Sequence, residues 1–468
     1  MLRRILPNVA IIGWAGLLVA GCATIQPKAT PAGGQTEQQT TLPEPRPLGA
    51  PDQTANREAG VGTTGMRDRV VEPTGTLGLA DALAIALLRN PELTAFSYAV
   101  RAAEARSLQA GLLPNPQLEF EVEEYNRGGE GFDAAETAVV LSQIVELGGK
   151  RRWRTRVAKA EGDLAGWDYE SKRLDVFTET AQRFTAVAAA QQRLELARSA
   201  VDLAEMTSGA VGERVKAGKE PSLQALKSEA ELEMARLEAR EAESVLDVAR
   251  QRLAAMWGAE QVSFSGVEGR LDDVLNDPPA LVTLRARLAL NPDLARGEAV
   301  LRLRQAAFSA EKAARVPDLE ASVGYRQFKE DGTHAFAFGI GLPLPLFDRN
   351  QGNILAAGYE RSKAEAERAA NETALATELA EVHASLTSSH QRVATLRAKV
   401  VPAMEQAFAA AHESYRQGKF DFLELLDAQR GLIEAKGALV DALSNYHAAL
   451  TDIQRITGTG IEELTTNK

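Results

Sequence analysis

One pattern of residues occurs twice in this chain, about 200 positions apart, and this repetition restricts the possible folds more than any other feature. Six residues recur at a displacement of 201: Asn90, Pro91, Leu93, Pro116, Leu118 and Glu119 correspond to Asn291, Pro292, Leu294, Pro317, Leu319 and Glu320. Six more recur at a displacement of 200: Gly218, Lys219, Leu223, Leu226, Leu232 and Gly258 correspond to Gly418, Lys419, Leu423, Leu426, Leu432 and Gly458. So small a drift indicates an internal duplication. We assign the first copy to residues 77–258, a linker to 259–279 and the second copy to 280–458.

The residue pattern of each copy predicts a helix, two strands, a very long helix, a turn that contains glycine and a return helix. In the second copy the apolar residues follow the heptad spacing of an antiparallel coiled coil. They are Leu375, Leu379, Val382, Leu386, Val393, Leu396 and Val400, followed by Leu432, Leu439, Leu443, Tyr446, Leu450 and Ile453. The outgoing helices span about 150–216 and 352–416, and at 1.5 Å per residue each is on the order of 100 Å long. Pro402 removes a backbone hydrogen bond inside the second, so we expect a kink or short break there.

The segments between these helices alternate strictly between apolar residues and polar or small ones. Leu118, Phe120 and Val122 alternate with glutamates. The second copy repeats the alternation in two runs, with apolar positions at Leu319, Ala321, Val323 and Tyr325, and at Phe336, Phe338, Ile340 and Leu342. Such segments are typical of membrane β-barrel strands, and the barrel lumen would then receive Glu119, Glu121 and Glu320. Open sheet edges are not tolerated in lipid, so four strands must be completed by other copies. A soluble pair of hairpins is the alternative.

The N-terminal segment predicts a lipoprotein signal peptide over residues 1–21. Arg3 and Arg4 precede a mostly apolar run that ends at Val19-Ala20-Gly21-Cys22, as in a processing signal. Cys22 is the only cysteine, and acylation of its sulfur and new amine would anchor the chain to a membrane. Ala23 and Thr24 follow it with no aspartate, which resembles lipoproteins sorted to the outer membrane. Residues 22–76 are rich in Pro, Gly, Thr and Gln and predict a flexible tether, and residues 459–468 form a tail. An ordinary signal peptide with an incidental cysteine is the alternative.

Charge and side-chain chemistry exclude several classes of function. The chain has 53 Lys and Arg against 64 Asp and Glu, which argues against a nucleic-acid partner because such partners require a basic face. His383 and His390 are seven residues apart, a spacing better interpreted as surface positions than as a ligand pair. The segment 148–150 lacks the spacing of a phosphate-binding loop. We therefore expect no enzyme, no cofactor and no high-affinity metal site.

With these features in place, the chain resembles the TolC-like outer-membrane efflux family from about Leu77 to Gly458. The segments that carry the match are 90–93 and 291–294, the strand starts at Pro116 and Pro317, and the run from Gly418 to Gln429. The runs 146–151 and 344–352 are most like the branch that serves cobalt, zinc and cadmium exporters of the RND type. The resemblance implies a mainly α protein with a membrane β-barrel: a homotrimer with four strands per protomer, a 12-stranded barrel, and a periplasmic tunnel of coiled-coil helices. It also implies a periplasmic adaptor, an inner-membrane RND-type pump and outer-membrane lipid as partners.

The resemblance further implies a periplasmic aperture at the second turn. In the family two carboxylates after the turn glycine line the constriction, and this pattern maps onto Glu424 and Asp427. Three residues apart on a helix, they share a face, so three protomers would present six acids around one axis and attract cations. Two solvated acids on a helix surface are the alternative. Phe420 stands where better-known relatives have a basic residue, which puts their closed-state linkages in doubt here.

The turns themselves, Gly218-Lys219 and Gly418-Lys419, are implied to contact the adaptor. We therefore expect an outer-membrane channel that passively conducts substrate, foremost divalent metal cations, from a pump and adaptor to the outside. A channel of the same type for drugs, organic compounds or secreted proteins is one alternative. A coiled-coil periplasmic spacer lipoprotein without a pore is the alternative from another class.

Overall fold

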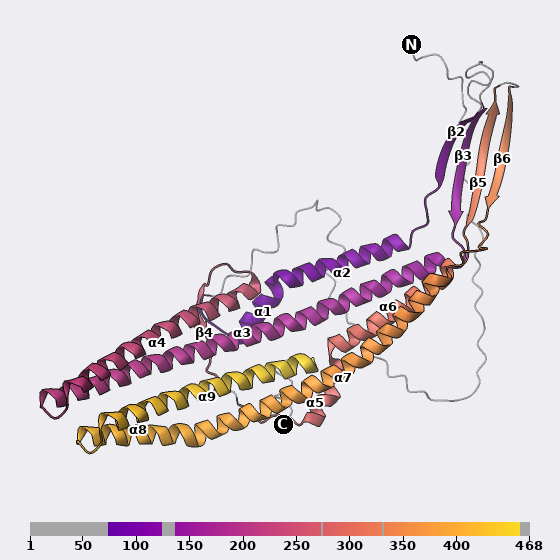
Figure 1. The fold of residues 1–468 in the computed structure, drawn as a ribbon. Helices are drawn as coiled ribbons and strands as arrows, with labels where there is room; N and C mark the ends of the chain where they lie inside the picture. The colour runs from indigo at the N-terminus through magenta and orange to yellow at the C-terminus, as the bar shows by residue number, and fades with distance from the viewer. Residues whose placement is uncertain (1–73, 124–135, 273–274, 330–331, 459–468) are drawn as a thin grey trace, which may run out of the picture. The chain divides into compact units, whose positions relative to one another are not determined.

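Two long helical hairpins and one four-stranded sheet make up most of the described chain (Figure 1). The computed structural model describes residues 74–123, 136–272, 275–329 and 332–458. Cys22, the signal peptide, all but the last residues of the tether and the C-terminal tail lie outside the described residues. None of the helices in the described ranges has the length and apolar composition that crossing a bilayer requires.

The order of elements is the same in both copies, except that the outgoing helix of the second copy is divided into α7 and α8. The first copy contains α1 (Leu79–Arg89), α2 (Pro91–Ala110), β2 (Gln117–Glu123), β3 (Glu136–Val145), α3 (Lys150–Lys216) and α4 (Ser222–Ala254). The second contains α5 (Leu281–Arg287), α6 (Pro292–Ala314), β5 (Leu319–Phe328), β6 (Thr333–Gly341), α7 (Gln351–Thr395), α8 (Val401–Arg416) and α9 (Phe422–Thr457). Short elements are β1 (Gly75–Leu77), η2 (Ala255–Trp257), β4 (Phe264–Val267), η3 (Leu288–Leu290) and the π-helical turn η4 (Leu396–Val400). The predicted duplicated, mainly helical fold is confirmed.

Each repeated asparagine starts a helix and joins it to the far end of its own copy. The side chain of Asn90 accepts a hydrogen bond from a first-turn amide of α2 at 3.0 Å and donates one to the carbonyl of Met256 at 2.9 Å. Asn291 likewise accepts from a first-turn amide of α6 at 2.6 Å and donates to the carbonyl of Ile456 at 2.8 Å. A proline follows each asparagine because the first helical position needs no N–H donor. The two Asn-Pro pairs therefore close each copy on itself.

The heptad seam of the second copy forms the contact between α7 and α9. Leu379 and Leu386 on α7 and Tyr446 and Ile453 on α9 are buried in one cluster. The interruption expected near Pro402 is also found, as the π-helical turn η4 that directly precedes α8. Proline has no N–H to donate to the preceding turn, and a π-turn is one way for a helix to accommodate this loss.

A short parallel pair of strands was not predicted from the sequence. Gly75 and Thr76, which the sequence assigned to the tether, lie in β1, and β1 pairs with β4 from the inter-repeat linker. Leu77 and Phe264 are buried beside Trp257 in a cluster that also includes residues of α1, α3 and α9. Strands of three and four residues are too short for an alternation pattern to reveal them.

The linker also explains two histidines that the sequence placed at the surface. The Nε2 atom of His383 lies 2.9 Å from the carbonyl oxygen of Pro279, and that of His390 lies 3.7 Å from a carboxylate oxygen of Asp277. Both side chains are only partly exposed. These positions therefore lie on the surface of α7 but are covered in part by the inter-repeat linker.

Candidate functional site

The four long strands form one antiparallel sheet with the order β2-β3-β5-β6. The register places Phe120 opposite Val139, Val139 opposite Tyr325, and Tyr325 opposite Phe336. Directly opposite residues of antiparallel strands project to the same face, so Phe120, Val139, Tyr325 and Phe336 share one face. This face is open: Phe338 is 82% exposed. A sheet that exposes such a face is suited to contact lipid.

The other face of the sheet carries the acids. Glu119 lies opposite Val140, Glu121 lies opposite Ala138, and Glu320 lies opposite Gly341. All three glutamates predicted for the lumen therefore project to one face, away from the phenylalanines.

Arg326 adds a basic group to the acidic face. Its guanidinium donates to carboxylate oxygens of Glu123 at 3.2 Å and Glu136 at 3.1 Å. Charged side chains therefore occupy this face also at the end of the sheet where Glu123 lies.

The edges of this sheet are unpaired within the described ranges. β2 and β6 each pair with a strand on one side only. Their free backbone N–H and C=O groups can pair with strands of another chain.

The two hairpin turns have the same geometry. Gly218 and Gly418 adopt left-handed conformations, with φ of 65° and 76°, which glycine reaches without strain. The amide of Lys219 donates to the carbonyl of Arg214, and that of Lys419 to the carbonyl of Ser414, both at 2.9 Å. These bonds end each outgoing helix in the glycine-capped manner typical of helix C-termini. Lys219 and Lys419 are exposed at the two turns.

Arg214 links one turn to the other. One guanidinium nitrogen donates to the carbonyl of Tyr415 at 2.9 Å, the other to Glu220 at 3.1 Å, and the group lies 4.8 Å from the Tyr415 ring centroid. Tyr415 is fully buried, and this burial raises the pKa of its hydroxyl. A Cβ atom on Gly418 would lie 3.2 Å from the Arg214 guanidinium and crowd it. Glycine at this position therefore allows both the left-handed turn and the position of Arg214.

This linking cluster of Arg214, Glu220 and Tyr415 was not predicted from the sequence. The residues that correspond to Arg214 and Tyr415 in the other copy are Ser414 and Val215. The signal that could have found the cluster is this break in the repeat beside two otherwise equivalent turns.

Glu424 and Asp427 lie together near the start of α9. Both side chains are exposed, whereas Phe422 and Leu425 on the opposite side of the helix are buried. Asp421 begins the helix, because its carboxylate accepts a hydrogen bond from the amide of Glu424 at 3.0 Å. Neither predicted aperture acid has an ion-pair partner among the described residues. The chain thus presents two uncompensated carboxylates on one helix face beside the second turn.

No group of three or more histidine, cysteine or acidic side chains in the described ranges is placed to hold a metal ion. The described surface has one apolar sheet face, one face that carries glutamates, and two exposed acids beside the second turn. A four-stranded sheet of this kind joined to two long helical hairpins defines a subunit of a TolC-like outer-membrane channel.

Known proteins with similar sequences support this assignment of the fold. The chain belongs to the family described as "Outer membrane efflux protein", whose sequence profile matches residues 82–259 and 283–459. It is 35% identical over 388 residues to the cobalt-zinc-cadmium resistance protein CzcC of Cupriavidus metallidurans, covering 83% of this chain and 91% of that protein. It is 26% identical to the nickel-cobalt-cadmium resistance protein NccC of Alcaligenes xylosoxydans xylosoxydans, covering 63% and 68%.

Solved structures share the fold. The structure of CusC superposes with a TM-score of 0.71 at 18% identity, covering 84% of this chain and 96% of that one. The outer membrane protein VceC of Vibrio cholerae superposes with a TM-score of 0.67 at 20% identity, covering 82% and 96%. The family match makes the chain an outer membrane efflux protein, and the solved structures confirm the fold that the sequence predicts.

Proposed function

We propose that this chain is the outer-membrane duct of a tripartite metal-efflux assembly and conducts divalent metal cations passively to the outside. The observation that carries the proposal is the sheet, which has an exposed apolar face, an acidic face and two free edges. Such a sheet is stable in lipid only when its edges are paired. The 35% identity to a cobalt-zinc-cadmium resistance protein favours metal cations as the cargo.

Three copies would give a barrel of twelve strands, with β6 of each chain paired to β2 of the next. The apolar face would then contact lipid, and Glu119, Glu121 and Glu320 would line the lumen. The helical hairpins would continue the duct into the periplasm. In this arrangement an acidic lumen favours the passage of cations.

The periplasmic end of the duct would be its aperture. Glu424 and Asp427 from three chains would place six carboxylates near one axis, and none is neutralised by an ion pair within the described chain. A periplasmic adaptor would contact the turns Gly218-Lys219 and Gly418-Lys419, and an inner-membrane RND-type pump would deliver the cations. The exposed Leu223 and Leu423 beside these turns offer apolar surface for the adaptor.

The lipid anchor is a separate part of the proposal. Cleavage before Cys22 and acylation of this residue would attach the chain to the outer membrane through the tether. Mass spectrometry of the mature N-terminus should give a diacylglyceryl group on Cys22. An unmodified N-terminus downstream of it would refute the anchor and leave the channel intact.

Planar-bilayer recording of the purified protein tests the duct and its aperture together. We expect the wild-type reversal potential in a tenfold salt gradient to approach the cation limit of roughly 59 mV. Glu424→Gln with Asp427→Asn should move it strongly toward zero. Glu238→Gln with Glu241→Gln is the matched control, because these two exposed acids have the same spacing on α4 and no ion-pair partner in the described chain. Absence of conductance would refute the duct, and a reversal potential unchanged in the aperture variant would refute the aperture.

The cargo is tested in cells. A strain that lacks this protein should become sensitive to zinc, cobalt or cadmium, and the wild-type chain should restore resistance. Sensitivity to organic dyes or drugs with unchanged metal resistance would replace metal cations by organic compounds as the cargo.

A further inference from the structure

The apolar face of the last strand continues beyond the sheet. Phe336, Phe338 and Ile340 occupy every second position of β6, and Leu342, Leu344 and Leu346 continue this spacing after the strand ends at Gly341. Prolines occupy two of the alternate positions, and proline favours an extended backbone in the residue before it. Leu344 is 72% exposed and the adjacent Phe347 is 90% exposed. Apolar side chains therefore extend to the level where the strands end and the helices begin.

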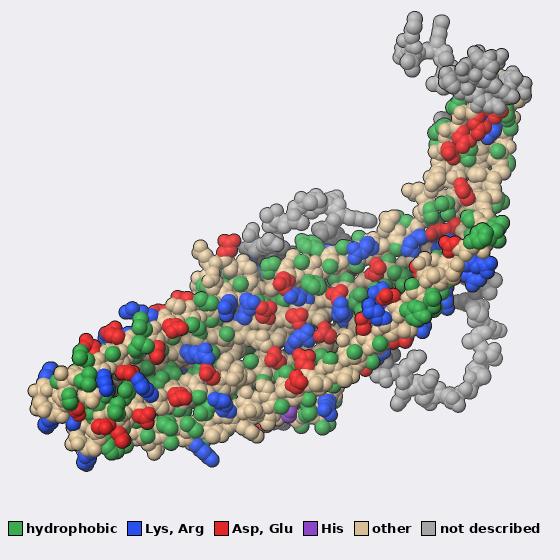
Figure 2. Space-filling view, viewed as in Figure 1, with side chains coloured by type: hydrophobic (Ala, Val, Ile, Leu, Met, Phe, Trp, Pro, Cys, Tyr) green, Lys and Arg blue, Asp and Glu red, His purple; other side chains and the backbone are tan. Residues whose placement is uncertain are grey.

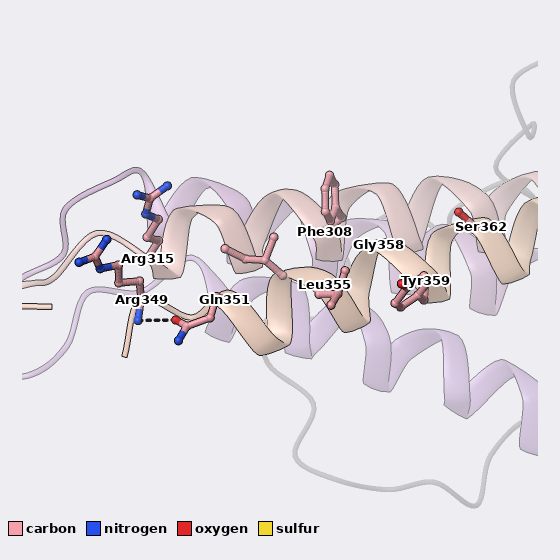
Figure 3. Close-up of a pocket in the computed structure, with 9 residues that line it drawn as sticks. Phe308, Arg315, Arg349, Gln351, Leu355, Gly358, Tyr359 and Ser362 are labelled. Atoms are coloured by element: carbon pink, nitrogen blue, oxygen red, sulfur yellow. Dashed lines mark hydrogen bonds between the residues drawn. The ribbon is translucent and has the colours of Figure 1, made fainter. Parts of the chain in front are cut away.

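A groove between α6 and α7 (Figure 3) adjoins this apolar segment, because Arg349 in its lining donates to the carbonyls of Pro345 and Leu346. Its volume is about 700 Å³, and its lining includes Phe308, Arg315, Arg349, Leu355 and Tyr359. Arg315 follows α6 and Arg349 precedes α7, and Figure 3 shows both at the same end of the groove that they line. Figure 2 shows basic and apolar side chains next to each other where the strands meet the helices.

Neither arginine is neutralised by a carboxylate within the described chain. Arg349 donates to the carbonyls of Pro345 at 3.2 Å and Leu346 at 3.4 Å, and Arg315 has no ion-pair partner among the described residues.

The acids nearby in the sequence bind other groups. Asp348 accepts a hydrogen bond from the amide of Asn350, and Glu311 accepts one from the side chain of Asn350. Two guanidinium groups are therefore available for an anion, and guanidinium geometry is well matched to phosphate.

The first copy provides a second cationic group at the same junction of strand and helix. Arg152 and Arg156 lie over the ring of Trp153, with guanidinium carbons 5.9 Å and 5.2 Å from its centroid. Neither has an ion-pair partner in the described part of the chain. Tryptophan and basic residues are enriched where membrane proteins meet the headgroup region. Both copies therefore present basic residues at the boundary of the apolar sheet face.

We propose that the groove between α6 and α7 binds an anionic phospholipid of the leaflet that faces the periplasm. Arg315 and Arg349 hold the headgroup phosphate, and the acyl chains lie along Leu344, Leu346 and Phe347 toward the strands. A lipid fits better than a soluble phosphate because the arginines adjoin apolar side chains continuous with the lipid-facing strand. This lipid site is separate from the proposed duct, because the channel could conduct in a membrane without anionic lipid.

Native mass spectrometry of the purified full-length protein tests the proposal, with phosphatidylglycerol and phosphatidylcholine titrated separately. The wild-type protein should bind phosphatidylglycerol in preference to phosphatidylcholine. Arg315→Gln with Arg349→Gln should weaken phosphatidylglycerol binding at least tenfold and leave phosphatidylcholine binding unchanged. The matched control is Arg240→Gln with Arg392→Gln, which removes two exposed arginines that have no ion-pair partner in the described chain. This control should bind as the wild type does.

A second variant separates a lipid from a soluble anion. Leu344→Ser with Leu346→Ser should also weaken phosphatidylglycerol binding, because it removes contacts to the acyl chains. Equal binding of the two lipids by the wild type, or unchanged binding in the arginine variant, would overturn the proposal. Displacement of the lipid by millimolar inorganic phosphate would assign the site to a soluble anion and overturn it as well. The proposal would also be overturned if another copy of the chain covers the groove in the assembled protein. Arg315 and Arg349 would then be protected from arginine-modifying reagents even without lipid.

Discussion

Asn291 provides the sharpest test of how the duplicated unit is held together. Its side chain is fully buried, accepts a hydrogen bond from the Asp293 amide at 2.6 Å and donates one to the carbonyl of Ile456 at 2.8 Å. The substitution Asn291→Ala removes both bonds while leaving the helix sequence of α6 intact. The start of α6 should then open more easily, because it loses its cap and its attachment to the end of α9.

The size of this effect follows from the two lost bonds. Loss of an asparagine cap costs about 1 kcal/mol. The carbonyl of Ile456 loses its side-chain donor, and an unsatisfied buried group costs about 1–3 kcal/mol. The sum is about 2–4 kcal/mol of local opening free energy, and since each 1.36 kcal/mol is tenfold, amide exchange should accelerate roughly 30- to 1000-fold.

Hydrogen exchange measured by mass spectrometry reports this local opening directly. Peptides that cover the first turn of α6 should exchange faster in Asn291→Ala. Asn90→Ala should have the same effect on α2 and leave α6 unchanged, because each asparagine closes its own copy. The exposed Asn371 provides the control substitution Asn371→Ala. Exchange at α6 within threefold of the wild type in Asn291→Ala would refute the reasoning.

Three further predictions concern the sheet, the turns and pH. A cysteine at Phe338 should resist a membrane-impermeant thiol reagent in a chain that lacks Cys22, whereas one at Glu121 should react; equal labelling of both would contradict opposite faces. Arg214→Ala should raise single-channel conductance or open probability because the two turns lose their link, whereas recordings identical to the wild type would assign Arg214 no role in opening. Burial lowers the pKa of His447, so the unfolded chain binds more protons, and thermal stability should fall as pH drops through about 6.5. His447→Gln should reduce that dependence, and melting curves with the same pH dependence in both proteins would disprove it.

The periodic parts of this protein were predictable from the sequence alone. The two-residue period of a strand decides that Phe336 and Glu121 lie on opposite sides of the sheet. The helical period likewise decides that Leu379 and Leu386 lie in one seam. These periods are properties of neighbouring residues along one segment. The duplication added the order of the elements, since the same pattern recurs 200 residues later.

Contacts between distant segments were decided only by the tertiary structure. Examples are the pairing of β1 with β4, the link from Arg214 to Tyr415, and the placement of Arg315 and Arg349 in one groove. No shared period connects these residues. A single arginine in a helix has the same local pattern whether it faces water, a carboxylate or an aromatic ring. Its partner is set by how the helices pack, because packing decides which side chains lie within bonding distance. The sequence therefore determined the elements and their faces, and the tertiary structure decided which of their polar residues lie together.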